Sequence, residues 1–226
     1  MKRFTRELLF LIVISLLLQW LVPTYIYPLI GLPSNGPVPI RTIVLVVVIS
    51  TYLKHSGEKW SQFGLSWPFK WWWLIVAVVG LFACKLFIIQ PTQDLIRSGL
   101  DLPRSDHRFF AHIEGNSLAL TIWLLIAWLS GGFGEEMIFR GYLIGRISPL
   151  FHNETVGFAI AITFQAVIFG LGHAYAGWGT ALMSMTNAFL LGLFLILVKR
   201  SIWPLIIVHG IWDTLGVLNF YLEGTQ

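Results

Sequence analysis

The stretch WWWLIVAVVGLFACKLFII, residues 71–89, decides the fold class of this protein. Its one charged side chain is Lys85, and the rest is almost entirely apolar. An α-helix needs about 20 predominantly apolar residues to cross the hydrocarbon core of a bilayer, so this stretch predicts a membrane-spanning helix. Working outward, comparable apolar runs lie near residues 8–30, 38–53, 117–134, 155–172, 180–198 and 202–222. The sequence therefore predicts about seven spans.

The composition of the whole chain agrees with this interpretation. Of the 226 residues, 56% are hydrophobic and 12% are charged, and this charged fraction is about half the roughly 25% typical of soluble domains. So apolar a chain is neither soluble nor disordered. The net charge of +4 forms no basic stripe, so we expect no nucleic-acid partner. We predict a single all-α, polytopic membrane domain over residues 1–226, with the lipid bilayer around it.

The 15 lysines and arginines predict the orientation of the chain. If the N-terminus is cytoplasmic and the spans alternate, ten basic residues lie on the cytoplasmic side. The remaining five lie outside, and they are Arg41, Lys85, Arg97, Arg104 and Arg108. The positive-inside rule then favours a cytoplasmic N-terminus. The short loops and the absence of eukaryotic targeting features favour a bacterial inner membrane. Residues 90–116 are expected to form a solvated external loop with some interfacial helix, which could act as a lid.

One group of ionisable residues closes the apolar run that begins at Ser117. An ionised side chain inside a span costs about 2.5 kcal/mol or more, so Glu135, Glu136 and Arg140 are functional candidates. Glu136 and Arg140 are four residues apart and can pair on one helical face. Glu135 points about 100° away, which leaves it free for chemistry. Ordinary interfacial charge at a helix end is the alternative. We also expect a continuous or gently broken helix over residues 117–147, which would carry Glu135 to middle depth.

Two histidines lie in the later apolar runs. His173 ends the segment that starts near residue 156, and His209 and Asp213 are four residues apart in the last run. Asp213 can accept a hydrogen bond from one imidazole nitrogen and so fix the orientation of the ring. With Glu135, these side chains could activate water and stabilise an oxyanion. They could also bind zinc, although no HExxH helix is present. Purely structural histidines remain an alternative, and no GxSxG serine turn occurs.

These residues form three ordered motifs, Glu135-Glu136-x-x-x-Arg140, Phe169-x-x-x-His173 and His209-x-x-x-Asp213. The pattern resembles the motifs EExxxR, FxxxH and HxxxN/D of the CPBP family, the CAAX-protease and bacteriocin-processing (Abi) intramembrane proteases. The resemblance covers residues 117–222, which would form the catalytic core. It implies an all-helical fold of seven or eight spans. It also implies hydrolysis of a peptide bond in a membrane-embedded or membrane-anchored protein or peptide.

The resemblance also implies a role for each motif residue. Glu135 would activate water with the assistance of His173, and His209 and Asp213 would support the oxyanion. Because an ionised Asp cannot donate a hydrogen bond, Asp213 is expected to orient His209. Glu136 and Arg140 would form a supporting pair. The family has been described both as a metalloprotease and as a metal-free glutamate protease, and we expect the latter, with no cofactor; zinc is the alternative.

Two other functions are compatible with a polytopic chain of this kind. One is a catalytically silent membrane partner in bacteriocin immunity or sensor regulation, which the complete motif set disfavours. The other is a transporter with a proton relay at the midplane. The sequence lacks the paired discontinuous helices typical of such transporters, which disfavours this alternative.

Overall fold

The described residues of the computed structural model, 2–67 and 70–225, form helices and no strands. Within them, six helical segments are long and apolar enough to cross a membrane. These are Phe4–Leu29, Trp71–Gly99, Ser117–Leu150, Glu154–Gly172, Trp178–Leu197 and Trp203–Glu223. The predicted all-α, polytopic membrane fold is confirmed, and six is close to the predicted seven to eight spans.

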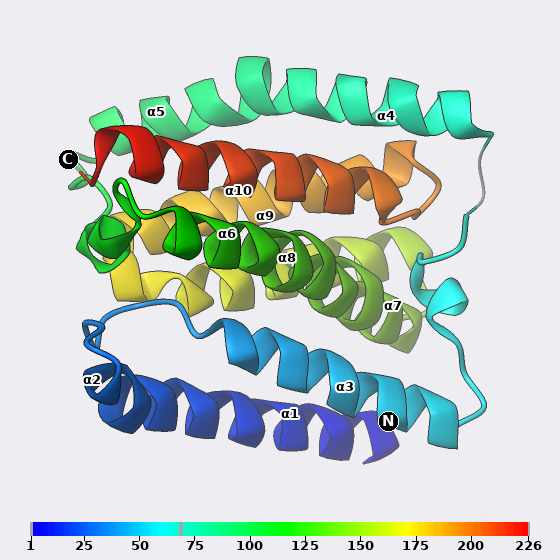
Figure 1. Cartoon of the computed structure of the whole chain (residues 1–226). Coiled ribbons are helices and arrows are strands. Elements are labelled where there is room, and N and C mark those ends of the chain that lie inside the picture. Colours follow the sequence, from blue (N-terminus) through cyan, green and yellow to red (C-terminus); the bar gives the residue numbers. More distant parts are fainter. Residues whose placement is uncertain (1, 68–69, 226) are drawn as a thin grey trace.

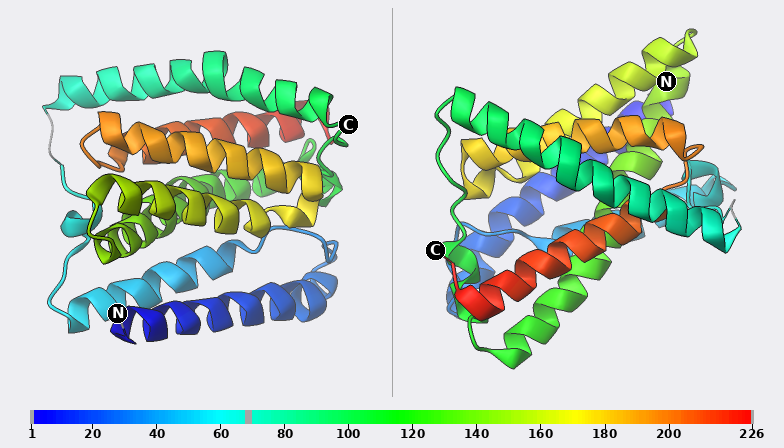
Figure 2. Two further views of the ribbon diagram at one scale, coloured as in Figure 1. Left: turned by 180° about the vertical axis from the view of Figure 1, so that it is seen from behind. Right: turned by 90° about the horizontal axis from the view of Figure 1, so that it is seen from above.

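The difference from the seven predicted apolar runs lies in one short helix, α3 (Pro39–His55). Its 17 residues extend about 26 Å, slightly less than the ~30 Å hydrocarbon core. It nevertheless runs beside α1 (Lys2–Leu21) as part of the bundle (Figure 1). The two ends of the chain lie at opposite ends of the bundle in Figures 1 and 2, which is the arrangement expected if α3 is a seventh pass.

Several spans are composite helices. A π-helical turn, η1 (Val22–Ile26), joins α1 to the short α2 (Tyr27–Leu29). The segment at residues 71–99 consists of α4 (Trp71–Cys84), the π-helical η3 (Lys85–Ile89) and α5 (Gln90–Gly99). The predicted loop at 90–116 therefore begins as a helical extension of the span. That loop ends with a 3₁₀ turn, η4 (Arg108–Ile113), and a second such turn, η2 (Trp60–Phe63), precedes α4.

The predicted continuous helix over residues 117–147 is confirmed. It runs through α6 (Ser117–Ile126), η5 (Ala127–Leu143), α7 (Ile144–Ile147) and the final turn η6 (Ser148–Leu150). Asn116 begins it as a side-chain cap, accepting a 3.1 Å hydrogen bond from the amide of Ala119. The η5 segment is π-helical, and such i→i+5 segments occur frequently at functional sites.

Three further helices complete the bundle: α8 (Glu154–Gly172), α9 (Trp178–Leu197) and α10 (Trp203–Glu223), with the short turn η7 (Ala174–Ala176) between α8 and α9. Asn153 caps α8 through a 3.0 Å hydrogen bond from the amide of Val156. The η5 segment packs against α3, α8 and α10. As Figure 1 and the left view of Figure 2 show, α1 and α3 lie on one side of these central helices and α4 and α5 on the other.

Glycines allow η5 and α10 to approach each other closely. A Cβ atom added to Gly132 would lie 3.0 Å from the backbone nitrogen of Gly210 and 3.0 Å from the carbonyl oxygen of Ile206. Backbone atoms cannot swing aside as a side chain can, so a larger residue at Gly132 would push the helices apart. This contact therefore fixes how closely the acidic doublet of η5 approaches the histidine of α10.

We predict that Gly132→Ala lowers the thermal stability of the protein. Overpacking of this kind costs about 1–3 kcal/mol, and in a domain of this size each kcal/mol lowers the Tm by roughly 2–4 °C. Thermal unfolding of the purified protein in detergent, followed by tryptophan fluorescence, would measure the change. Gly80→Ala on α4 is the matched control, because its Cβ would meet nothing within 4 Å. Equal Tm values for the two variants would contradict the close contact.

Candidate active site

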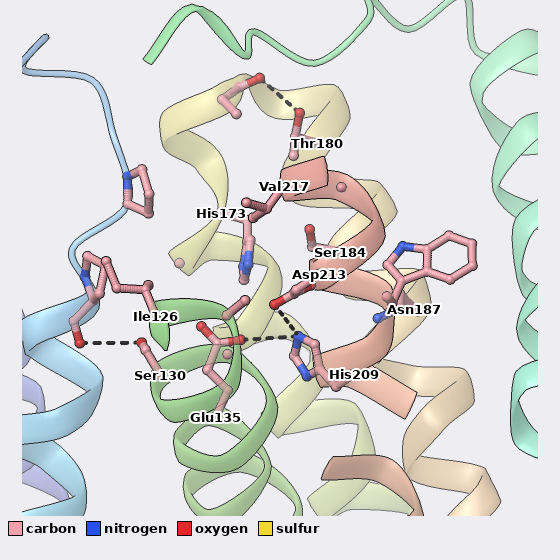
Figure 3. A pocket seen from close by; sticks show the side chains of 18 of the residues that line it. Ile126, Ser130, Glu135, His173, Thr180, Ser184, Asn187, His209, Asp213 and Val217 are labelled. Atoms are coloured by element: carbon pink, nitrogen blue, oxygen red, sulfur yellow. Dashed lines mark hydrogen bonds and ion pairs between the residues drawn. The ribbon is translucent and has the colours of Figure 1, made fainter. Parts of the chain in front are cut away.

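The four residues predicted to be catalytic meet in one cavity of about 800 Å³ inside the bundle. Glu135 comes from η5, His173 follows the end of α8, and His209 and Asp213 lie on α10. Figure 3 shows all four side chains directed into the cavity. The fold therefore brings together residues from three separate helical segments. In the sequence these residues are linked only by their resemblance to the motifs of one family.

His209 lies at the centre of three carboxylates. Its Nδ1 atom is 2.7 Å from Oε1 of Glu136, and its Nε2 atom is 3.5 Å from Oδ2 of Asp213 and 3.9 Å from Oε2 of Glu135. A carboxylate can only accept, so Nδ1 donates its hydrogen to Glu136. A proton on Nε2 would be the donor that His209 offers to an oxygen atom bound in the cavity.

The contact between Glu136 and His209 was not anticipated from the sequence. The four-residue spacing predicts that Glu136 pairs with Arg140 alone, and Asp213 is the residue expected to orient His209. In the structure the imidazole donates its short hydrogen bond to Glu136, while Asp213 lies near the other nitrogen at the longer distance. Because η5 is wound more widely than an α-helix, successive residues turn through a smaller angle. The two neighbouring glutamates therefore reach the same imidazole.

The orientation of His173 follows from its own helix. Its Nδ1 atom is 2.8 Å from the carbonyl oxygen of Phe169, four residues earlier. That oxygen only accepts, so Nδ1 donates and the Nε2 lone pair is left as the acceptor. The imidazole also stacks on the Phe169 ring, with centroids 4.5 Å apart. The FxxxH spacing thus provides both the acceptor and the ring that hold His173.

A buried ion pair lies next to these side chains. Nη1 of Arg140 lies 3.1 Å from Oε1 of Glu136, and neither side chain is exposed (0% each). The Arg140 guanidinium also lies 4.7 Å from the centroid of the Phe169 ring, within the range of a cation–π contact. Arg140 therefore contacts Glu136, which accepts the hydrogen bond from His209, and Phe169, which holds His173.

Two basic residues that the orientation count placed on the outer side also line the cavity. These are Arg41 on α3 and Lys85 on η3. Lys85 is only 5% exposed, and it lies within the span that the sequence predicts at residues 71–89. The signal for Lys85 was present, since a lone charge within an apolar run is a candidate for function.

Outside the spans, His107 and Tyr175 also line the cavity. Burial raises the pKa of the Tyr175 phenol well above its usual range, and the nearby negative charges of Glu135 and Asp213 act in the same direction. Tyr175 therefore remains a neutral hydroxyl at physiological pH. Burial lowers the pKa of His107, with partial compensation from Asp106. His107 and Phe110 belong to the predicted lid region, which thus contributes to the cavity wall.

The described part of the chain contains no group of three or more His, Cys, Asp or Glu side chains arranged to hold a metal ion. Nδ1 of His173 is already engaged with a backbone carbonyl, and Nδ1 of His209 is engaged with Glu136. The expectation of a metal-free reaction stays a prediction, which the experiments below address.

Comparison with known proteins identifies one family. Residues 117–215 match the family described as "Type II CAAX prenyl endopeptidase Rce1-like". The matched region contains all three motifs, so the predicted resemblance to the CAAX-protease and Abi family is confirmed. The match supports an intramembrane endopeptidase of the CAAX type in an integral membrane protein. Searches of curated proteins and of solved structures gave no match.

We predict that Arg140→Met strongly destabilises the protein, because it leaves the buried carboxylate of Glu136 without its cation. Breaking a buried pair by removing one partner costs about 3–5 kcal/mol. The Tm in detergent measures this loss. Arg108→Met is the matched control: it removes the ion pair with Asp106, in which the arginine is 82% exposed, and is expected to change the Tm little. A similar Tm for both variants would contradict a stabilising role for the buried pair.

Proposed function

We propose that this protein is an intramembrane endopeptidase that uses Glu135 as a general base to hydrolyse a peptide bond in a membrane-anchored or membrane-embedded substrate. The observation that carries the proposal is the position of the Glu135 carboxylate, 3.9 Å from Nε2 of His209 in a cavity also lined by His173. The cavity thus contains a base (Glu135), an acceptor that can orient water (His173) and a donor for an oxyanion (His209). The family match at residues 117–215 supports a CAAX-type substrate.

In the first step, a water molecule bound between Glu135 and His173 donates one hydrogen bond to each. His173 is suited to this task because its Nε2 lone pair is left free by the bond from Nδ1 to Phe169. Glu135 takes a proton as the water oxygen forms a bond to the carbonyl carbon of the peptide. General-base assistance of this kind accelerates hydrolysis by about 10²–10⁴-fold.

As that bond forms, one electron pair of the carbonyl double bond moves to the oxygen and creates a tetrahedral oxyanion. His209 takes part as the doubly protonated imidazolium, which the three surrounding carboxylates stabilise: Nδ1 donates to Glu136, and the Nε2 hydrogen donates to this oxygen beside the carboxylate of Asp213. It keeps both protons throughout the reaction. The oxyanion then reforms the carbonyl, the carbon–nitrogen bond breaks, and protonated Glu135 gives its proton to the leaving amine. One water is consumed, and the carboxylate of Glu135 is regenerated.

The orientation of the chain is also a proposal. Arg41, Lys85 and Arg140 lie inside the bundle, so none of them is a loop charge. Of the 15 basic residues, this leaves nine on the predicted cytoplasmic side and three outside. The corrected distribution supports a cytoplasmic N-terminus more strongly than the original count. A bacterial inner membrane is the setting we propose.

We predict that Glu135→Gln abolishes hydrolysis while the protein stays folded. The amide keeps the size of the side chain but cannot take a proton from water, so the rate should fall by about 10²–10⁴-fold. The assay uses purified protein in proteoliposomes and a quenched fluorescent peptide that ends in a farnesylated C-a-a-X tail. Mass spectrometry identifies the cleaved bond, and Glu114→Gln, an exposed glutamate, is the matched control.

Each outcome of this assay has a clear meaning. Wild-type activity in Glu135→Gln would reject the mechanism and would favour a silent membrane partner for any function that persists in cells. Failure of the wild-type protein to cleave the farnesylated peptide would reject the CAAX-type substrate.

We further predict that chelators leave the activity unchanged. The proposed base is a carboxylate, so neither EDTA nor 1,10-phenanthroline should reduce the rate in the same proteoliposome assay. A loss of activity that added Zn²⁺ restores would contradict the glutamate mechanism and support the zinc alternative.

A further inference from the structure

A buried lysine holds an asparagine on the wall of the cavity. Nζ of Lys85 donates a 3.1 Å hydrogen bond to Oδ1 of Asn187 on α9, and it lies 4.5 Å from the centroid of the Trp212 ring. Lys85 also interacts electrostatically with Asp213 and Glu136. Both Lys85 and Asn187 line the cavity that contains the catalytic residues.

This contact determines which way the Asn187 amide faces. A lysine ammonium has three donors and no acceptor, so only the amide oxygen can lie against it. The amide nitrogen must then point away from Lys85. Among the described residues, this nitrogen has no hydrogen-bond partner. Asn187 therefore offers two unused N–H donors at the cavity wall, in an orientation fixed by Lys85.

The proposed reaction needs such donors. The carboxylates of Glu135 and Asp213 can only accept when ionised, and the donor of His173 is engaged with Phe169. This leaves His209 as the one donor that the mechanism has assigned to the oxyanion. Figure 3 shows Asn187 on the other side of Asp213 and His209 from Glu135. A carbonyl bound between Glu135 and Asn187 would have the base on one side and this donor on the other.

We infer that Asn187 is a second oxyanion donor, held in its active orientation by Lys85. As water adds and the carbonyl electron pair moves to oxygen, the amide N–H of Asn187 donates to that oxygen together with Nε2–H of His209. Lys85 is a positioning residue, since it acts through the amide oxygen. This inference rests on the proposed function, because it assigns a further residue to the same reaction.

The test is Asn187→Asp in the proteoliposome assay with the farnesylated C-a-a-X peptide. The new carboxylate still accepts from Lys85, so the fold is preserved, but the amide donor is gone. Removal of one oxyanion donor typically lowers kcat by about 10²–10³-fold, and we expect that loss with little change in KM. Asn187→Ala serves as a second variant. Asn35→Asp is the matched control, because Asn35 lies in an exposed loop.

An unchanged kcat in both Asn187→Asp and Asn187→Ala would overturn the inference. A rise in KM at constant kcat would also overturn it, since that pattern indicates a contact made equally in the ground state. The proposed function would survive either result if Glu135→Gln still abolished cleavage. If the wild-type protein did not cleave the peptide, the proposed CAAX-type activity itself would fail, and this inference with it.

The positioning role of Lys85 has its own test. Lys85→Met should lower kcat in the wild-type background but cause no further loss in the Asn187→Ala background, because the amide it orients is already absent. Lys85→Arg, which keeps a donor for Oδ1, should restore part of the rate. Equal losses in both backgrounds would show that Lys85 acts independently of Asn187 and would overturn its positioning role.

Discussion

The buried ion pair between Glu136 and Arg140 is the interaction on which the rest of the site depends. Each ion taken out of water costs several kcal/mol, and their mutual attraction compensates only when further contacts satisfy the remaining charge. Here Glu136 also accepts from His209, and Arg140 lies against the Phe169 ring. The pair on η5 therefore contacts both α10 and α8, the helices that position the two histidines of the proposed active site.

The π-helical winding of η5 explains why two adjacent glutamates can serve one imidazole. In a regular α-helix two adjacent side chains point about 100° apart, and for this reason the sequence predicts that Glu135 and Glu136 have different partners. The wider winding brings both carboxylates towards His209, at Nδ1 for Glu136 and at Nε2 for Glu135. Their roles still differ: Glu136 is fully buried and paired with Arg140, whereas Glu135 lines the cavity where substrate and water can reach it.

The sequence was sufficient for the features that depend on periodicity and spacing. Apolar runs located each long helix, and the four-residue spacings of Glu136–Arg140 and Phe169–His173 correspond to real contacts. The sequence did not predict the features that depend on how deep a residue lies in the bundle or on how widely a helix is wound. Lys85 was counted with the outer charges although it lies within the predicted span at residues 71–89, and the spacing of residues gave no indication that it lines the cavity. The contact between Glu136 and His209 depends on the π-helical winding of η5, and no residue pattern in the motif predicts that winding.

The charges around the cavity explain why the N-terminal half is part of the site although the family match begins at residue 117. Three carboxylates lie in or against the cavity, on Glu135, Glu136 and Asp213, and in a membrane bundle they require compensation. The matched region supplies one permanent cation, Arg140; Arg41 on α3 and Lys85 on η3 supply the other two. Because α3 and α4 flank the central helices from opposite sides (Figure 1), the two cations reach the cavity from opposite walls. The charge balance of the motif residues in the C-terminal half therefore depends on helices whose sequences carry no motif.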